Sequence, residues 1–363
     1  MQKSNDPAIF WIGLSSIPGV GRVTFRKLAH HFGSPERALA ATQDELGEAG
    51  LSEKVIADIA SSSWREHAEQ ELDKARKTGV RIIIADDTAY PPVLRDTPDP
   101  PLFLYIKGNL LREDGVAIVG TRKPTHYGLT VTHRIAYELA AAGLTIVSGL
   151  ARGIDTQAHR GALAAKGRTI AVLGCGIDIV YPPENRDLLE RISGNGAVVT
   201  ENPFGTKPEA GYFPARNRII SGLSRGTVII EATEDSGSLI TANYTIEQGR
   251  KLFSVPGNIG SPNSRGTNNL IKQGAVLVES SDDILRSLGR KRPRTDQKRG
   301  MPMPALTPDE ECVLRCIMSE PRHIDVIMNE SRLAAGRLSG VLITLELKGL
   351  AKQLPGKYYV REE

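Results

Sequence analysis

The sequence predicts an α/β protein whose core is a Rossmann-like, mostly parallel sheet, with a small all-α N-terminal domain and a C-terminal winged-helix domain. Between Val116 and about Leu288, short apolar runs alternate with amphipathic stretches. Strands that are apolar on both faces and linked by helices are typical of a parallel sheet covered on both sides. No strand pattern precedes Val80, and a basic run at 290–299 separates the core from the C-terminal residues.

These composition changes divide the chain into a helical domain at 1–78, an extended Rossmann-like domain at 79–289, a basic linker at 290–305 and a winged-helix domain at 306–363. The length of 363 residues, with 40% hydrophobic and 24% charged residues, is ordinary for a globular chain of two or three domains. The first residues carry no signal-peptide pattern, and no apolar run is long enough to span a bilayer. We therefore expect a cytoplasmic protein that does not associate with membranes.

The N-terminal segment has the apolar spacing of short helices, with Phe25, Leu28, Ala29 and Phe32 on one face. The turn at 17–21, Ile-Pro-Gly-Val-Gly, precedes a helix from about Arg22 and is similar to a helix-hairpin-helix turn. Free amides at the start of that helix would suit a phosphate. Such small helical modules also serve only as packing or protein-contact units, so the pattern supports both interpretations.

Seven apolar runs predict the strands of the core, and the intervening stretches 129–142, 156–165 and 239–249 predict helices. The predicted strands are Val116–Val119, Thr145–Val147, Thr169–Leu173, Ala197–Thr200, Thr227–Ile230, Leu252–Val255 and Ala275–Val278. Ligands of such sheets bind beyond the carboxyl ends of the strands. The residues in those places are glycine-rich and polar, as in Gly120-Thr121-Arg122, Ser148-Gly149-Leu150-Ala151-Arg152 and Ser236-Gly237-Ser238. A Gly-Thr-Arg turn can form a nest of amides for a phosphate, with a guanidinium to clamp it.

The stretch 211–218, Gly-Tyr-Phe-Pro-Ala-Arg-Asn-Arg, places two aromatic rings beside two arginines just ahead of a helix expected at Ile219–Leu223. Aromatic faces stack on unpaired bases, and arginines pair with backbone phosphates. The alternative is that Phe213 belongs to the core and the arginines hold the loop by salt bridges. Its expected position near the glycine-rich edge favours the nucleic-acid interpretation.

The sequence predicts no cofactor and no metal. Gly120 lacks the spacing of a dinucleotide fingerprint, and no phosphate-binding loop with Gly-Lys-Ser or Gly-Lys-Thr occurs, which argues against NAD and ATP. Cys312 and Cys316 lie four apart without a second pair, so all three cysteines are expected to be reduced and structural. Asp155 and His159 are also four apart, and we interpret them as a helix N-cap and a packed or capping histidine.

The net charge of +4 is concentrated in one segment. Residues 290–299 hold six basic residues and one acidic residue, a net +5, so the remainder carries about −1. We interpret this run as a solvated linker, with a DNA-tethering arm as the alternative.

Several ordered motifs closely resemble those of the DNA-processing protein A (DprA, or Smf) family: 116–122 Val-Ala-Ile-Val-Gly-Thr-Arg, 148–155 Ser-Gly-Leu-Ala-Arg-Gly-Ile-Asp, 213–220 Phe-Pro-Ala-Arg-Asn-Arg-Ile-Ile, 236–242 Ser-Gly-Ser-Leu-Ile-Thr-Ala and 255–257 Val-Pro-Gly. The flanks fit a sterile-alpha-motif-like (SAM-like) or helix-hairpin-helix N-terminus and a winged-helix C-terminus. The resemblance implies a protein, not an enzyme, that binds and protects incoming single-stranded DNA and helps load the RecA recombinase during natural transformation and recombination. It also implies a homodimer formed through the central domain.

Carried over by position, the resemblance assigns a groove for nucleic acid. Its expected residues are Gly120, Thr121 and Arg122 at a phosphate, Ser148, Gly149 and Arg152 in the same groove, Phe213, Arg216, Asn217 and Arg218 as a base-facing and basic wall, Ser236, Gly237 and Ser238 on the far side, and Lys207 as a weaker candidate.

Residues 306–363 match a winged helix, with a helix opened by Thr307–Glu311, a candidate recognition helix at Ala334–Lys348 and a hairpin wing at 354–360. The recognition helix carries Arg337 and Lys348 but few other side chains that read bases, which favours protein docking or weak DNA binding.

The main rival is a Rossmann-like nucleotide phosphoribohydrolase, a class that uses a Pro-Gly-Gly-x-Gly-Thr-x-x-Glu turn. Aligned on that turn, Thr241 stands where the glutamate would be, and a hydroxyl cannot supply acid/base catalysis. Glu231 is the residue that would have to substitute. A third interpretation, a scaffold without nucleic-acid contact, leaves Arg122, Arg216 and Arg218 without a shared purpose.

Overall fold

The computed structural model describes residues 6–361 except 62, 111–113, 291–305 and 319. The chain forms two compact units: residues 1–124 with 128–291, and residues 292–363 with 125–127. The basic linker expected at 290–305 lies, apart from Arg290, outside the described residues.

The first unit holds a nine-stranded sheet whose strand order is β1-β2-β6-β5-β4-β3-β7-β8-β9. The seven strands from β6 to β9 in this order are parallel, and β2 and β1 extend them by antiparallel pairing on β6. The bounds are β1 Arg81–Ile84, β2 Phe103–Gly108, β3 Gly115–Gly120, β4 Thr145–Ser148, β5 Thr169–Val172, β6 Ala197–Thr200, β7 Gly226–Ile230, β8 Lys251–Ser254 and β9 Val276–Leu277. All seven strands expected from the apolar runs are therefore confirmed.

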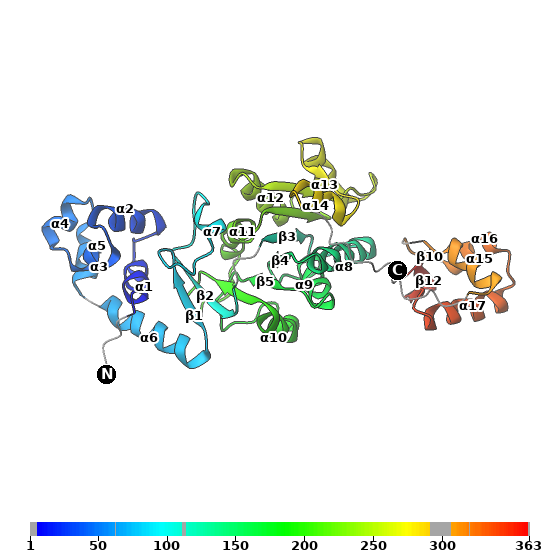
Figure 1. Ribbon diagram of the computed structural model, residues 1–363, viewed down its shortest axis with the longest axis horizontal. Helices are drawn as coiled ribbons and strands as arrows, with labels where there is room; N and C mark the ends of the chain where they lie inside the picture. Colours follow the sequence, from blue (N-terminus) through cyan, green and yellow to red (C-terminus); the bar gives the residue numbers. More distant parts are fainter. Residues whose placement is uncertain (1–5, 62, 111–113, 291–305, 319, 362–363) are drawn as a thin grey trace. The chain divides into compact units, whose positions relative to one another are not determined.

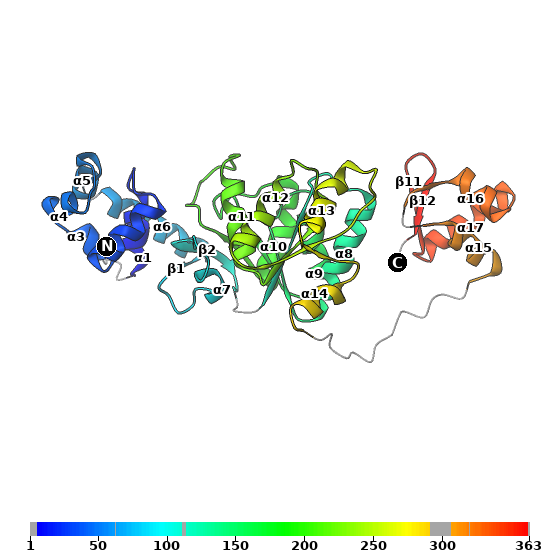
Figure 2. The same ribbon diagram turned by 90° about the horizontal axis from the view of Figure 1, so that it is seen from above.

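Helices cover both faces of this sheet, as the sequence predicts. Figures 1 and 2 show helices on both faces. One face carries α8 (His126–Ala141), α9 (Ile154–Ala164) and α10 (Arg186–Asn195); the other carries α11 (Tyr212–Gly222), α12 (Gly237–Glu247) and α13 (Pro262–Lys272). Because β3 to β6 progress in one direction and β7 to β9 in the other, the strand order reverses between β3 and β7.

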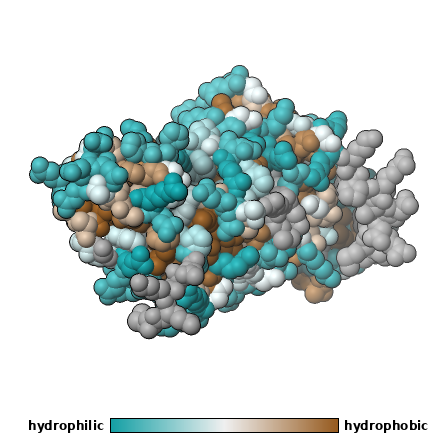
Figure 3. Space-filling model, turned by 60° about the vertical axis from the view of Figure 1, so that its left-hand side comes forward, coloured by the Kyte–Doolittle hydropathy of each residue, from teal (hydrophilic) through white to brown (hydrophobic). Residues whose placement is uncertain are grey.

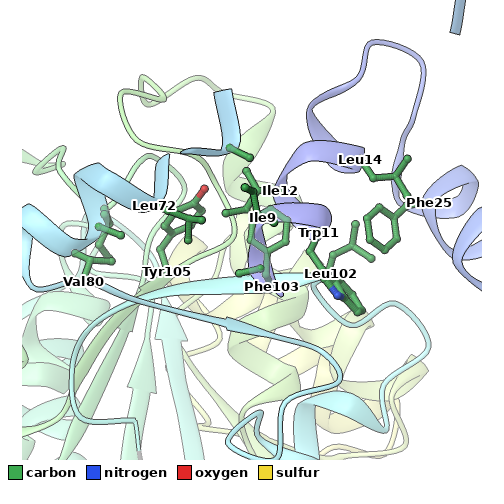
Figure 4. Packing of buried hydrophobic residues seen from close by; sticks show 14 of the residues in the cluster. Ile9, Trp11, Ile12, Leu14, Phe25, Leu72, Val80, Leu102, Phe103 and Tyr105 are labelled. Carbon is green, nitrogen blue, oxygen red and sulfur yellow. The ribbon is translucent and has the colours of Figure 1, made fainter. Parts of the chain in front are cut away.

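The N-terminal helices share a core with the sheet. They are α1 Ala8–Ser16, α2 Arg22–Phe32, α3 Pro35–Ala40, α4 Gln43–Glu48, α5 Glu53–Ala60 and α6 Ser63–Thr78. Figure 4 shows Ile9 and Ile12 of α1 and Leu72 of α6 packed toward Phe103 and Tyr105 of β2. The buried carboxylate of Glu71 accepts hydrogen bonds from the Tyr105 hydroxyl at 2.9 Å and the Phe204 amide at 3.0 Å.

The turn between α1 and α2 has the predicted conformation, with Gly19 at φ +88° and Gly21 preceding the helix. The first side chain of α2, Arg22, forms an ion pair with Asp99 at 2.9 Å, and Arg26 reaches the same carboxylate at 2.9 Å. This end of α2 therefore lies against the core of the first unit.

The second unit is a small winged helix. It contains α15 Pro308–Cys316, α16 Ile324–Ser331, α17 Ala335–Leu347 and an antiparallel sheet of β10 Arg322–His323, β12 Tyr358–Arg361 and β11 Ala351–Leu354. The expected recognition helix is α17, and the wing is the hairpin of β11 and β12. The two basic residues expected on the recognition helix form ion pairs within this unit: Arg337 pairs with Asp309, and Lys348 pairs with Glu310.

All three cysteines are free thiols. None of the described helices has the length and apolar character needed to cross a membrane. On the face shown in Figure 3, hydrophilic residues predominate and apolar ones are scattered among them.

Candidate nucleic-acid interface

A cleft of about 900 Å³ opens at the carboxyl edge of the sheet, beside the ends of β3 and β7. The loop after β3 supplies Gly120 to Lys123, and the loop after β7 supplies Thr233 to Gly237. α11 forms a further wall. This is the point where the strand order reverses, which is where open α/β sheets bind their ligands.

The turn after β3 is held close to β7. The Thr121 amide donates to the Glu231 carbonyl at 2.8 Å. A Cβ at Gly120 would collide with the Ile230 carbonyl oxygen, so only glycine permits this approach. The Thr121 hydroxyl accepts the Lys123 amide at 3.2 Å, which closes the turn and leaves the Arg122 side chain exposed in the cleft.

The stretch 212–218 is helical. α11 begins at Tyr212, so the prediction of a loop followed by a helix at 219–223 was wrong. Pro214 is tolerated because it lies in the first turn, where backbone amides have no partner within the helix. Phe213, Arg216 and Asn217 are spaced three and four residues apart and thus share the face of α11 that lines the cleft.

The Phe213 side chain is partly exposed and lies beside a second aromatic ring and two cationic side chains. Its ring packs against Gly174, and the ring of Tyr181 is 5.5 Å away at a tilt of 40°. The guanidinium of Arg122 lies 5.5 Å from the Phe213 centroid and that of Arg216 lies 6.0 Å from it. Both earlier interpretations of Phe213 thus have support, since the ring packs on backbone and also faces the cleft.

Arg216 belongs to the floor of the cleft. Its side chain is 4% exposed and donates to the carbonyl oxygens of Gly149, at 2.6 Å, and Val172. A Cβ on Gly149 would meet this guanidinium at 2.5 Å, so glycine is required behind the arginine. Burial lowers the pKa of Arg216 to about 10, opposed by the nearby Asp155 carboxylate, and the side chain is cationic at neutral pH.

Asp155 is not the helix N-cap. Gly153 precedes α9, and Asp155 lies in the first turn, where its carboxylate accepts the amides of Gly149 at 3.0 Å and Ala151 at 3.4 Å. It thus bridges the glycine loop that precedes the helix. Burial raises the pKa of Asp155, while Arg216 and the two amides oppose that rise.

His159 is packed, as predicted. It is fully buried, and its Nδ1 lies 2.6 Å from the Thr169 hydroxyl. Because that hydroxyl donates to the Ile146 carbonyl, it accepts from Nδ1–H, and the histidine is the neutral Nδ1–H tautomer. Burial, and to a smaller extent the nearby Arg216, lowers the pKa of His159 to about 3.

The far side of the cleft is the start of α12. The Ser236 side chain accepts the Ser238 amide at 3.4 Å and caps the helix, and the two hydroxyls are 2.8 Å apart. Asn217 donates to the Gly237 carbonyl at 3.3 Å, which joins α11 to this loop. Nine of the fourteen expected residues line one cleft: Gly120, Thr121, Arg122, Phe213, Arg216, Asn217, Ser236, Gly237 and Ser238.

The other five do not line it. Ser148 is buried and donates to the Ile118 carbonyl at 2.7 Å, and Gly149 lies behind Arg216. Lys207 is exposed on the loop before α11, next to the lining residue Pro208. Arg152 is exposed and pairs with Glu184.

Arg218 points away from the cleft. Its guanidinium is 4% exposed and pairs with Asp99 at 3.1 Å and Glu201 at 2.5 Å. Arg218 follows Phe213 by five residues, which is well over one turn of an α-helix, so the two side chains lie on different faces of α11. Burial raises the pKa of Asp99, but Arg218, Arg22 and Arg26 outweigh it and hold that pKa below its usual value. Arg218 thus joins α11 to the N-terminal helices through a shared ion-pair network.

Lys123, Asn263 and Tyr181 are among the lining residues that were not expected. Lys123 follows Arg122 directly and could have been found from the strand-end rule. Asn263 donates to the Lys123 carbonyl at 3.2 Å, and Tyr181 reaches the cleft from the loop after β5. Neither carried a sequence signal. No group of three or more potential metal ligands occurs in the part of the chain that the structure describes.

Comparison with known proteins gives a consistent result. The model of the family described as DNA recombination-mediator protein A matches residues 81–289, and that of the DprA winged helix domain matches 297–357. The chain is 38% identical to protein Smf of Synechocystis sp., covering 99% of this chain and 100% of that protein. It is 43% identical to DNA processing protein DprA of Bacillus subtilis, covering 59% and 73%.

Two solved structures are similar. The X-ray structure of DNA processing protein A from Streptococcus pneumoniae has a TM-score of 0.69 and 34% identity, and covers 78% of this chain and 98% of that one. The DNA processing protein A of Helicobacter pylori, whose structure concerns its single-stranded DNA binding mode, has a TM-score of 0.53 and 33% identity, with coverage of 58% and 95%. The predicted resemblance and fold class are both confirmed.

Proposed function

The chain belongs to the DNA recombination-mediator protein A family, and from that membership we propose that it binds single-stranded DNA in the cleft between β3 and β7. Backbone phosphates lie at the turn of Gly120, Thr121 and Arg122, and unpaired bases lie against α11. Ser236, Gly237 and Ser238 bound the opposite side, and Lys123 adds a cation at the rim.

The observation that carries this proposal is the pairing of a cation with an aromatic ring at one wall of the cleft. Arg122 is exposed and lies over Phe213, and both residues face the cleft. Single-stranded nucleic acid needs both elements, because its phosphates bind cations and its unpaired bases stack on rings. Duplex DNA, whose bases are already stacked, gains only from the first.

A binding titration tests the proposal. The purified chain is titrated with a single-stranded oligonucleotide and with a duplex of equal length at the same salt concentration. We expect tighter binding of the single strand. Equal affinity for both, or no binding of either, would contradict the proposal.

The partners follow from the same proposal. From the family membership we propose that this chain protects incoming DNA and helps load RecA during natural transformation and recombination, in the cytoplasm. Faster filament assembly by RecA on single strands coated with this chain would support the role. No effect at any ratio of the two proteins would exclude it.

A homodimer through the central domain is also proposed. β9 lies at the end of the sheet, pairs only with β8 there, and exposes Leu277 to 43%. An edge strand with an exposed apolar side chain is suited to association. Sedimentation of the parent and of a Leu277→Lys variant tests it, and we expect the variant to shift toward monomer.

We propose that binding, and not catalysis, is the activity of the cleft. Thr241 is 1% exposed, and it stands where the rival phosphoribohydrolase class needs a glutamate. The other candidate carboxylate, Glu231, lies against Gly128 of α8 and is 6% exposed. The cleft presents guanidinium, ammonium, hydroxyl and aromatic groups, which suit a polyanion, together with the carboxylates of Asp155 and Asp235.

The winged helix is proposed to dock a protein partner. Arg337 of α17 and Lys348, which caps the end of that helix, are paired with carboxylates of α15, while Ile343 and Leu347 of α17 are 58% and 84% exposed. Fewer basic side chains of this helix are therefore available to bind phosphates than its sequence suggested.

A further inference from the structure

The cleft contains a second aromatic ring that its proposed function has not used. Tyr181 comes from the loop after β5, lies partly buried in the cleft wall, and contacts the ring of Phe213. It carries no charge and is not part of any strand or helix. The residue also packs against the apolar core cluster of the first unit, so its ring serves the core as well as the cleft wall.

The two rings differ in what covers them. Arg122 and Arg216 lie over Phe213, at 5.5 and 6.0 Å from its centroid. Among the described residues, no cation lies over the ring of Tyr181. Tyr181 thus offers the less occupied aromatic face of the cleft.

The loop that carries Tyr181 is held in place from two sides. Asn185 donates to the Leu150 carbonyl at 3.0 Å and to the Thr156 hydroxyl at 2.8 Å. One residue earlier in the chain, Glu184 pairs with Arg152. A ring positioned in this way loses little conformational entropy when a ligand stacks on it.

The geometry of the two rings excludes a shared base. Their centroids are 5.5 Å apart and their planes are inclined at 40°. One flat base cannot stack on both planes, whereas two successive bases of a flexible single strand can take different orientations.

We propose that Tyr181 is a second base-stacking residue of the cleft and that it holds the nucleotide next to the one at Phe213. This inference rests on the proposed binding of single-stranded DNA. It assigns the ring of Tyr181, and not its hydroxyl, as the contact.

The test uses the full-length chain with an oligonucleotide of thymidines and with the same backbone lacking bases. Tyr181→Ala is expected to weaken binding of the thymidine strand by about 5- to 150-fold, as the loss of one stacking contact does. Tyr181→Phe keeps the ring and is expected to bind within about twofold of the parent. Tyr137→Ala removes a tyrosine that is 44% exposed on α8 and outside the cleft lining, and serves as the matched control.

On the base-free strand, the parent and Tyr181→Ala should bind alike. Combining Tyr181→Ala with Phe213→Ala should weaken binding more than either change alone, although the two losses are not expected to multiply because the rings are in contact. A Tyr181→Phe loss as large as that of Tyr181→Ala would overturn the proposal, since it would assign the effect to the hydroxyl. Melting curves of each variant separate a binding loss from unfolding.

A photochemical measurement on the unaltered chain keeps the test independent of folding. Oligonucleotides carrying 5-iodouracil are irradiated with the parent protein, and the crosslinked residues are mapped by mass spectrometry. Crosslinks at Tyr181 as well as at Phe213 are expected. Binding of single strands with crosslinks at Phe213 alone would refute the role of Tyr181 and leave the proposed function intact, whereas absence of single-strand binding by the parent would refute the proposed function itself.

Discussion

The guanidinium of Arg122 lies over the ring of Phe213, 5.5 Å from its centroid. The two residues come from segments that are distant in the sequence, one just after β3 and the other in the first turn of α11. Their contact places a charge for phosphates and a surface for bases side by side. The first prediction separates these two contributions.

Arg122→Ala should weaken single-strand binding for every base composition and reduce the slope of log affinity against log salt by about 0.7, because one fewer counterion is released. Phe213→Ala should cost about 1–3 kcal/mol through lost stacking and leave that slope nearly unchanged. Titrations at several salt concentrations measure both. Arg286→Ala, which removes an arginine whose side chain is 76% exposed on α14 (Ser281–Ser287), is the matched charge control.

On a strand without bases, Phe213→Ala should bind like the parent. If Phe213 served only the core, Phe213→Ala would lower the melting temperature. The variant and the parent would then differ in affinity for the base-free strand as much as they do for the normal strand. Unchanged affinity of both folded variants would mean that the groove lies elsewhere.

Arg218→Ala should act on stability and not on the salt slope. The side chain is 4% exposed and pairs with Asp99 and Glu201. Its removal takes the buried cation out of this network and leaves Asp99 paired with Arg22 and Arg26, and Glu201 with Arg22 at 3.7 Å. We expect a loss of up to about 3 kcal/mol in the free energy of unfolding, below the range for a wholly buried pair because Asp99 is 36% exposed. Urea denaturation measures this loss. A variant of unchanged stability with a flatter slope of log affinity against log salt would instead show that Arg218 contacts DNA in the groove.

His159→Gln should flatten the dependence of stability on pH. The folded-state pKa is about 3, whereas an unfolded histidine titrates near about 6.5, so below that pH the unfolded state binds a proton that the folded state does not. Stability is therefore lost as the pH falls from about 6.5 toward 3, by up to about 1.4 kcal/mol per pH unit. Denaturation of the parent and the variant between pH 7.5 and 5 measures the difference, and identical slopes would contradict the assignment of a buried neutral histidine.

Residues 1–290 should retain single-strand affinity within about twofold, because every residue of the cleft lies in the first unit. Residues 110–289 should not fold stably. That fragment lacks β2, which pairs with β6 and contributes the fully buried Leu104, Tyr105 and Ile106. Circular dichroism melting and DNA titration of the two fragments check both statements, and a cooperative transition in the shorter fragment would show that β2 is dispensable.

Incubation with nucleoside monophosphates should release no free base. Thr241 has no acid/base capacity, and the Glu231 carboxylate is directed toward α8. Chromatography of the reaction detects free base. Release by the parent that is abolished in Glu231→Gln would favour the hydrolase.

Much of the fold was predictable because buried parallel strands are recognisable as short apolar runs. All seven runs from Val116 to Val278 are strands of the sheet. β1 and β2 were missed as members of that sheet. β1 pairs with β2 and β2 pairs with β6, both antiparallel. This pairing has no connecting helix that could be recognised in the sequence.

The site was predictable in part for a similar reason. Glycine turns after strands converge on one edge of any parallel sheet, so Gly120 and Ser236 could be assigned to one cleft from their positions in the chain. Arg216 and Arg218 could not be distinguished in this way. They lie two residues apart, yet one reaches the cleft floor and the other the ion pairs with Asp99 and Glu201.

The sequence by itself determined the α/β core, the strand-end loops and the family, because apolar periodicity and glycine turns are local properties of the chain. Only the tertiary structure decided which side chains share the cleft. α11 begins at Tyr212, two turns before the expected start, and that start sets the rotation of the whole helix. It brings Phe213 beneath Arg122 and beside Tyr181, directs Arg218 to the N-terminal helices, and depends on contacts between segments that are distant in the sequence.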